Sequence, residues 1–72
     1  MEHVASQKEH FQYPPIAVGP EEAGRLTAHS RSAIYNAIAE GSLRSFKNGK
    51  RRLILVSELH LWLNRLAKEN SK

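Results

Sequence analysis

Residues 30–52 read SRSAIYNAIAEGSLRSFKNGKRR, and this stretch decides the fold. Ser30 suits the N-cap of a helix because its hydroxyl can accept a hydrogen bond from a free backbone N–H. Gly41 suits the other end because glycine readily adopts the left-handed conformation that ends a helix. Ile34 and Ile38 are four residues apart and form one apolar stripe. The stretch therefore predicts a helix over residues 30–40 with a polar outer side.

The second half of the stretch predicts a basic β-hairpin. Residues 43–47 and 50–56 are two strand-like runs joined by Asn48-Gly49, a dipeptide that favours a turn with positive φ at both residues. Residues 25–52 contain seven Lys or Arg residues and a single acid, Glu40, and so have a net charge of +6, whereas the whole chain has +4. The positive charge is therefore concentrated in this part of the chain.

The flanking sequence predicts two more helices. Gly19 and Pro20 suit the start of a first helix, roughly residues 20–26, whose inward side chains should be Ala23 and Leu26. Residues 27–29 then form a turn. Ser57 is expected to cap a third helix that runs to about Lys68. The expected fold class is α+β and mostly helical: a small winged helix-turn-helix in the order helix, turn, helix, two-stranded hairpin wing, C-terminal helix.

The chain divides into three expected parts. Residues 1–13 should be a flexible N-terminal arm, residues 14–68 the winged helix-turn-helix domain and residues 69–72 a disordered tail. The first residues lack a secretory signal pattern, and the longest apolar run, residues 53–56, is far too short to span a membrane. We therefore expect a cytoplasmic protein without a membrane partner.

One ordered set of residues carries a family resemblance over roughly residues 16–66. The set is Glu22-Ala23, Leu26, Ser30-Arg31-Ser32, Ile34-Tyr35, Gly41, Leu43, Phe46-Lys47, Gly49-Lys50-Arg51, Ile54, Ser57-Glu58-Leu59 and Trp62-Leu63. It resembles the excisionase-type helix-turn-helix domain, a family of small winged-helix DNA-binding proteins related to MerR-type regulators. The resemblance implies a bacterial or phage-encoded protein. The chain departs from the family pattern in its turn, Ala28-His29, and at Gly24, where the family often has alanine.

A helix that enters the major groove presents its N-terminal outward side chains to the bases. Arg31 can match the two acceptors of guanine, and Asn36 can pair with adenine through its amide. Tyr35 can touch a thymine methyl group or a phosphate, and Ser32 can bond either bases or backbone. A solvated helix face carries such residues in many proteins, so it is the neighbouring basic hairpin that favours DNA contact.

The expected phosphate contacts come mainly from the wing, and one wing side chain can enter a minor groove. They are Ser30, Arg44, Lys47, Asn48, Lys50, Arg51 and Arg52. Charges on an edge strand also discourage aggregation, but five cations without an interleaved acid exceed that need.

Three leucines stand where the family commonly has polar residues. Leu53 and Leu55 lie on one side of the second predicted strand while Ile54 and Val56 lie on the other, so both sides are apolar. We expect Leu53, Leu55 and Leu61 to contact the N-terminal arm, through Phe11 or Tyr13, or a second copy of the protein.

Nothing in the sequence supports catalysis, a cofactor or a metal site. There is no cysteine, and the four histidines have no zinc-binding spacing. We expect a sequence-specific double-stranded DNA-binding protein, either an excisionase-like architectural factor or a small transcriptional regulator. Its possible partners are further copies bound cooperatively on DNA, an integrase or RNA polymerase. The alternative is a protein–protein interaction module that has the helix-turn-helix shape without binding DNA.

Overall fold

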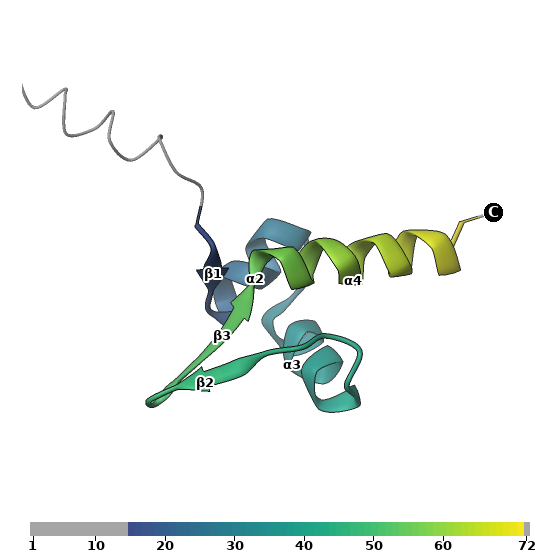
Figure 1. Cartoon of the computed structure of the whole chain (residues 1–72). Coiled ribbons are helices and arrows are strands. Elements are labelled where there is room, and N and C mark those ends of the chain that lie inside the picture. Colours follow the sequence, from purple (N-terminus) through teal and green to yellow (C-terminus); the bar gives the residue numbers. More distant parts are fainter. Residues whose placement is uncertain (1–14, 72) are drawn as a thin grey trace, which may run out of the picture.

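A computed structural model describes residues 15–71, and its elements follow the predicted order with one addition (Figure 1). The helices are α2 (Pro20–Thr27), α3 (Arg31–Glu40) and α4 (Val56–Glu69), and the strands are β1 (Ala17–Val18), β2 (Phe46–Asn48) and β3 (Arg51–Leu55). The predicted fold class, a small α+β winged helix-turn-helix, is confirmed. The β2–β3 hairpin, residues 46–55, is the wing.

The addition is β1, which turns the predicted two-stranded hairpin into a three-stranded antiparallel sheet of order β1-β3-β2. Ala17 pairs with Leu55 and Val18 with Ile54. A strand of two residues has no alternating pattern by which the sequence could reveal it. Because β1 pairs directly with β3, the chain entering the domain is fixed to the base of the wing.

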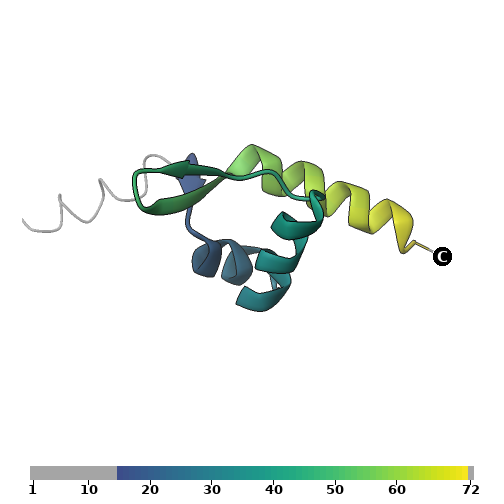
Figure 2. The same ribbon diagram turned by 90° about the horizontal axis from the view of Figure 1, so that it is seen from below.

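The core lies between the inner side of the sheet and the three helices. Figure 2 shows the sheet and α4 on one side of the molecule and α2 with α3 on the other. The buried apolar side chains come from every layer and from the loop before the wing: Val18, Ala23, Ile34, Ala37, Leu43, Ile54, Leu59 and Trp62. Ile34 and Ile54 are completely inaccessible, so the apolar stripe of α3 packs inward as predicted.

The predicted inward face of α2 is wrong in one residue. Ala23 is buried as expected, but Leu26 is 49 % exposed, and Gly24 and Thr27 are buried instead. The hydroxyl of Thr27 donates to the carbonyl oxygen of Ala23 at 2.8 Å, and this hydrogen bond lowers the free-energy cost of burying the hydroxyl. The inward face therefore follows residues 23, 24 and 27, and Leu26 lies at its edge.

The turn between α2 and α3 packs closely on Gly24. The backbone N–H of His29 donates to the carbonyl oxygen of Gly24 at 2.8 Å. A Cβ at residue 24 would lie 2.7 Å from the carbonyl oxygen of His29, closer than real Cβ contacts come. Ala28 adopts a left-handed conformation with φ of 59°. The glycine that departs from the family pattern is therefore required by this close approach.

His29 fills the space beside the turn. Its ring lies 4.8 Å from the ring of Trp62, centroid to centroid, at an interplanar angle of 49°. Its Nδ1 lies 2.7 Å from the carbonyl oxygen of Thr27. The polar residue in the turn is thus partly buried and hydrogen-bonded, so it contributes to packing.

The predicted limits of α3 are confirmed, since Ser30 is its N-cap and Gly41 its C-cap, with φ of 87°. The Ser30 hydroxyl accepts a hydrogen bond from the N–H of Ala33 at 3.0 Å. The N–H groups of Ser42 and Leu43 both donate to the carbonyl oxygen of Ala37 near the end of the helix. Leu43 is therefore a buried core residue outside the wing, and its predicted place in the first strand is wrong.

The hairpin is confirmed, but its turn is displaced by one residue from the prediction. Asn48 pairs with Arg51 in the ladder, which leaves Gly49 and Lys50 as the two loop residues. Gly49 has φ of 67°, whereas Asn48 and Lys50 do not have positive φ. A positive φ at the first loop residue alone is the pattern of a type II′ turn, which requires glycine only there.

The start of α4 also differs from the prediction. The helix begins at Val56, with Leu55 at the N-cap position, so Ser57 is not the cap. The N–H of Val56 donates to the carbonyl oxygen of Ile16 at 2.8 Å. The chain before β1 therefore satisfies the first backbone donor of α4, and Val56 belongs to the helix rather than to the wing.

The expected N-terminal arm, residues 1–13 with Phe11 and Tyr13, lies outside the described residues, as does Lys72. At the other end, α4 runs through Glu69, and Asn70 donates to the carbonyl oxygen of Leu66 at 2.9 Å. Within residues 15–71, none of the helices has the length and apolar character needed to cross a membrane.

Candidate nucleic-acid interface

All four predicted base-reading side chains lie on the exposed side of α3. Arg31, Ser32, Tyr35 and Asn36 are solvent-exposed, while Ile34 and Ala37 on the opposite side are buried. The Arg31 guanidinium carbon lies 5.4 Å from the centroid of the Tyr35 ring. A cation at this distance is attracted to the ring, so the two side chains form a pair on the first turn of the exposed face.

The helix and the wing line one open concavity of about 400 Å³. Arg31 and Tyr35 contribute from α3, and Arg51 and Arg52 contribute from β3. In Figure 1, α3 and the tip of the wing both lie at the lower side of the molecule. The structure therefore brings part of the predicted base-reading set and part of the predicted phosphate-binding set to the same surface.

Arg52 is the most constrained of the wing cations. Its Nη1 donates to the hydroxyl oxygen of Ser45 at 2.7 Å, and its side chain is partly buried. It lies opposite Lys47 in the β2–β3 register, so both residues are on the side of the sheet that carries Ile54. Because Ile54 is a core residue, this is the side that faces the helices.

The remaining predicted residues lie around the concavity or away from it. Lys47, Asn48 and Lys50 are exposed in the wing, and Ser30 is exposed at the N-cap of α3. Arg44 instead lines a second hollow with Ser45, Phe46, Leu55 and Glu58. The predicted phosphate-binding set is therefore divided between two surfaces, and Arg44 is the residue that lies apart.

Sequence reasoning missed one wall of the concavity, the start of α2. Gly19, Pro20, Glu21 and Glu22 line it together with the arginines. Their pattern revealed a helix start, but only the tertiary fold shows that this start lies beside α3 and the wing.

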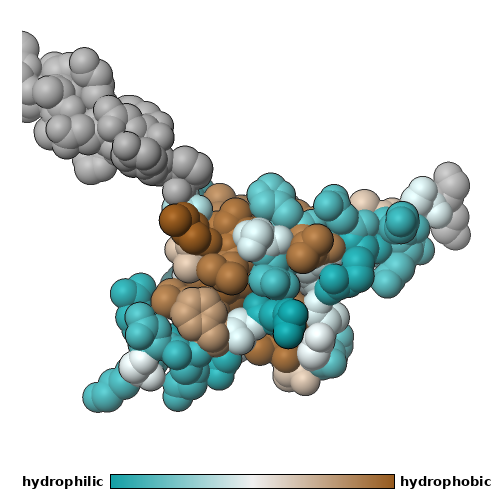
Figure 3. Space-filling model, in the orientation of Figure 1, coloured by the Kyte–Doolittle hydropathy of each residue, from teal (hydrophilic) through white to brown (hydrophobic). Residues whose placement is uncertain are grey.

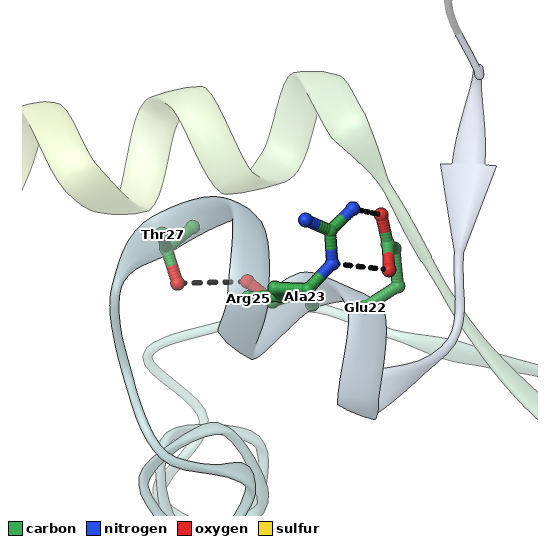
Figure 4. A network of polar contacts seen from close by, with 4 residues as sticks. All are labelled: Glu22, Ala23, Arg25 and Thr27. Atoms are coloured by element: carbon green, nitrogen blue, oxygen red, sulfur yellow. Dashed lines mark hydrogen bonds and ion pairs between the residues drawn. The ribbon is translucent and has the colours of Figure 1, made fainter.

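One of these acids is paired within its own helix. Nε of Arg25 donates to Oε1 of Glu22 at 3.0 Å, and a second contact joins Nη2 to Oε2, as Figure 4 shows. The hydrogen bond from Arg25 lowers the pKa of the Glu22 carboxyl below its ordinary value of 4.5; desolvation opposes this lowering, and the attraction of the positive charge adds to it. The same hydrogen bond raises the pKa of Arg25. The negative charge of Glu22 beside the basic surface is thus offset locally.

The three predicted interface leucines lie on the outer side of the sheet and on α4. Leu55 and Leu61 are 37 % and 52 % exposed, and Leu53 is partly buried. Among residues 15–71 there is no group of three His, Cys, Asp or Glu side chains that could hold a metal ion.

The comparisons with known proteins agree with this geometry. A family model described as a helix-turn-helix domain matches residues 18–67, which include the three helices as far as Ala67 and the whole wing. No curated protein and no solved structure matches the chain. The matching family is one of DNA-binding domains and not of enzymes. The chain therefore belongs to the excisionase-type helix-turn-helix family and is a DNA-binding helix-turn-helix protein.

Proposed function

We propose that the protein binds double-stranded DNA sequence-specifically, with α3 in the major groove and the wing on the adjacent phosphates or in the minor groove. The observation that carries this proposal is the single concavity lined by Arg31 and Tyr35 of α3 and by Arg51 and Arg52 of the wing. A duplex that lies against the surface around this concavity meets the proposed base-reading and phosphate-binding groups together.

Base reading falls to the first turns of α3. Arg31 is the first helical residue and recognises guanine through two hydrogen bonds, each such pair discriminating by about 1–3 kcal/mol against a wrong base. Asn36 lies one turn further along the exposed face and pairs with adenine. Ser32 contacts a base edge or the DNA backbone, and Tyr35 contacts a thymine methyl group or a phosphate.

Phosphate binding falls to the wing and to the N-cap of α3. Arg51 and Arg52 line the concavity together with α3, and Lys47, Asn48 and Lys50 extend the basic surface along the wing. The hydroxyl oxygen of Ser30 accepts from Ala33, which leaves its proton to be donated to a phosphate. Arg44 contacts a phosphate only if the duplex extends past the edge of the wing.

The small size of the domain limits how strongly one copy can bind DNA. One such module buries only about 600–1,000 Å² on DNA, so it reads a short site weakly and needs neighbouring copies or a partner. We propose a bacterial or phage-encoded cytoplasmic protein that acts as an excisionase-like architectural factor or as a small transcriptional regulator, with an integrase or RNA polymerase as partner. The rival function is a protein–protein interaction module without DNA binding, and the exposed Leu55 and Leu61 favour it.

The test is selection of a binding site from random duplexes, followed by fluorescence anisotropy at several salt concentrations. Contact with about four to six phosphates gives a slope of log K against log salt of roughly −4 to −5. Lys50→Ala should make this slope less steep by about one unit and keep the selected sequence. Arg31→Ala should weaken binding about ten- to hundredfold and relax the preference at one base pair.

The matched control is Lys68→Ala, because Lys68 is an exposed cation in the last turn of α4, distant in sequence from the concavity. It should leave the selected sequence unchanged and the salt slope nearly so. If no sequence is enriched and the chain binds no duplex at low salt, the DNA-binding proposal is wrong and the interaction module takes its place.

A further inference from the structure

The outer side of the sheet carries an apolar face at the base of the wing, while Asn48 and Arg51, which are proposed to contact DNA, lie on the same side nearer the tip. Phe46 lies opposite Leu53 in the β2–β3 register, and Leu55 follows Leu53 on the same side of β3. Phe46 is 42 % exposed and Leu55 37 % exposed. We use the name outer sheet face for Phe46, Leu53 and Leu55 together with Leu61 of α4, which is 52 % exposed. Figure 3 shows hydrophobic surface gathered over the sheet and a smaller hydrophobic area over α4 beside it.

Two opposite charges border this face. Arg44 and Glu58 line the same hollow of about 200 Å³ as Phe46 and Leu55. Among the described residues, neither Arg44 nor Glu58 forms an ion pair within the chain. A surface with one positive and one negative group beside an apolar centre can be complementary to a second copy of itself, because a two-fold axis that passes between the two groups would bring Arg44 of each copy to Glu58 of the other.

The outer sheet face also has an orientation compatible with DNA binding. It lies on the side of the sheet opposite Ile54, and therefore away from α2 and α3, as Figure 2 shows for the sheet and the helices. The tip of the wing and α3 both lie at the lower side of Figure 1, the side proposed to meet DNA. A duplex that contacts both from this side therefore leaves the base of the wing, with the outer sheet face, accessible.

We infer that a second copy of this chain docks on the outer sheet face. This inference names a partner for the DNA-bound protein, and it rests on the proposed function. Phe46, Leu53, Leu55 and Leu61 of the two copies pack together, with Arg44 and Glu58 paired across the two-fold axis. Burial of the apolar surface drives the association, and the charge pairs fix its orientation.

The size of the face predicts when this contact forms. A patch of this kind covers on the order of a few hundred Å², below the ~800 Å² per partner that stable complexes bury. Two copies therefore associate weakly in solution and strongly only where DNA holds them side by side at a high effective concentration. The outer sheet face thus produces cooperative binding to paired sites.

The symmetry predicts the arrangement of those sites. A two-fold axis that runs along the direction in which α3 and the wing tip point keeps both DNA-facing surfaces on the same duplex. Half-sites related by a two-fold axis form an inverted repeat, whereas a direct repeat would require a head-to-tail contact between different surfaces.

The experiment measures binding of the full chain to duplexes with one selected half-site, two inverted half-sites at varied spacing, or two direct half-sites. At one spacing, the inverted pair should bind the second copy at least tenfold more tightly than the single half-site. Leu61→Glu and Glu58→Arg should each abolish this cooperativity and change single-site affinity by less than about twofold. His60→Glu is the matched control: it places a carboxylate on an exposed neighbour in α4, outside the outer sheet face, and should preserve cooperativity.

Independent binding to every inverted pair, cooperativity confined to direct pairs, or full cooperativity in Leu61→Glu would each overturn the inference. Sedimentation of the DNA-free chain near millimolar concentration tests the inference separately from the proposed function. If the chain binds no duplex but forms a dimer that Leu61→Glu abolishes, the docking of a second copy is supported and the proposed DNA binding is wrong. If DNA binds and the chain stays monomeric and non-cooperative, DNA binding stands and the second copy fails, with residues 1–14 or another protein as the occupant of the face.

Discussion

The guanidinium of Arg31 lies over the ring of Tyr35, with its central carbon 5.4 Å from the ring centroid. The two residues are one helical turn apart on the exposed side of α3, and both line the concavity shared with the wing. A flexible arginine loses rotamer entropy when it binds a base, and a side chain already held in place loses less. We therefore propose that Tyr35 positions Arg31 for the base contact proposed above.

Replacement of Tyr35 tests this positioning. Tyr35→Leu removes the ring and should weaken specific DNA binding about two- to fivefold, the equivalent of an exposed cation–π contact of about 0.5–1 kcal/mol. Tyr35→Phe retains the ring and should stay within about twofold of the parent. Anisotropy titration of both variants on the selected duplex provides the comparison. Equal losses in the two variants would show that the hydroxyl, rather than the ring, is what matters.

Gly24→Ala should destabilise the fold even though alanine favours helices by about 1 kcal/mol over glycine. The new Cβ would lie 2.7 Å from the backbone oxygen of His29, so the turn must move, at a cost of about 1–3 kcal/mol. Urea denaturation monitored by Trp62 fluorescence measures this change. Asn64→Ala on the exposed side of α4 is the control and should leave the stability equal or slightly higher. A stabilised Gly24→Ala chain would rule out the close approach.

Ser30 and Ser57 form a matched pair, since both were expected to cap helices and only Ser30 does so. Ser30→Ala removes the hydroxyl that accepts from Ala33 and should cost about 0.5–2 kcal/mol of stability. Ser57→Ala should change the free energy of unfolding by less than about 0.5 kcal/mol. Thermal denaturation of the two variants side by side distinguishes them, and equal losses would contradict the assigned start of α4.

The Glu22–Arg25 pair predicts a small pH dependence of stability. Because the pKa of Glu22 is lower in the folded chain than its ordinary value of 4.5, the folded state favours the carboxylate. The stabilisation is present above pH 4.5 and is lost as the pH falls through the lower, folded pKa. Glu22→Gln should therefore be less stable than the parent at pH 6 and approach it in acid. Denaturant titrations at pH 3 and pH 6 measure this difference, and a gap that widens in acid would reverse the assignment.

Much of the fold could be predicted because its signals are local. The serine and glycine that bound α3, the hairpin glycine and the spacing of Ile34 and Ile38 each act within a few residues. Two predictions were wrong because of backbone hydrogen bonds that the residue pattern does not show. The N–H of Val56 donates to the carbonyl oxygen of Ile16 where α4 begins, one residue before Ser57. The N–H of Leu43 donates to the carbonyl oxygen of Ala37, so Leu43 lies at the end of α3 and not in the strand.

The candidate site likewise has a part that local spacing predicts and a part that only the tertiary fold shows. Exposure of Arg31 and Asn36 follows from helical periodicity, so the exposed face of α3 could be predicted from spacing alone. The sequence could not show that Arg52 is held by Ser45, that Arg44 lies on another surface, or that the start of α2 forms a wall of the concavity. These relationships depend on the twist of the wing and its angle to α3, which no local pattern encodes.

Contact of α3 and the wing tip with one duplex can be tested by cleaving DNA from the two positions. The chain contains no cysteine, so Ser32→Cys and Lys50→Cys each allow a single iron chelate to be attached. On the selected duplex, the chelate at residue 32 should cut within the recognised bases. The chelate at residue 50 should cut the backbone of the same duplex within about one helical turn, ~10 base pairs, of that site. Cleavage from residue 32 with none from residue 50, or cleavage from neither, would contradict the account.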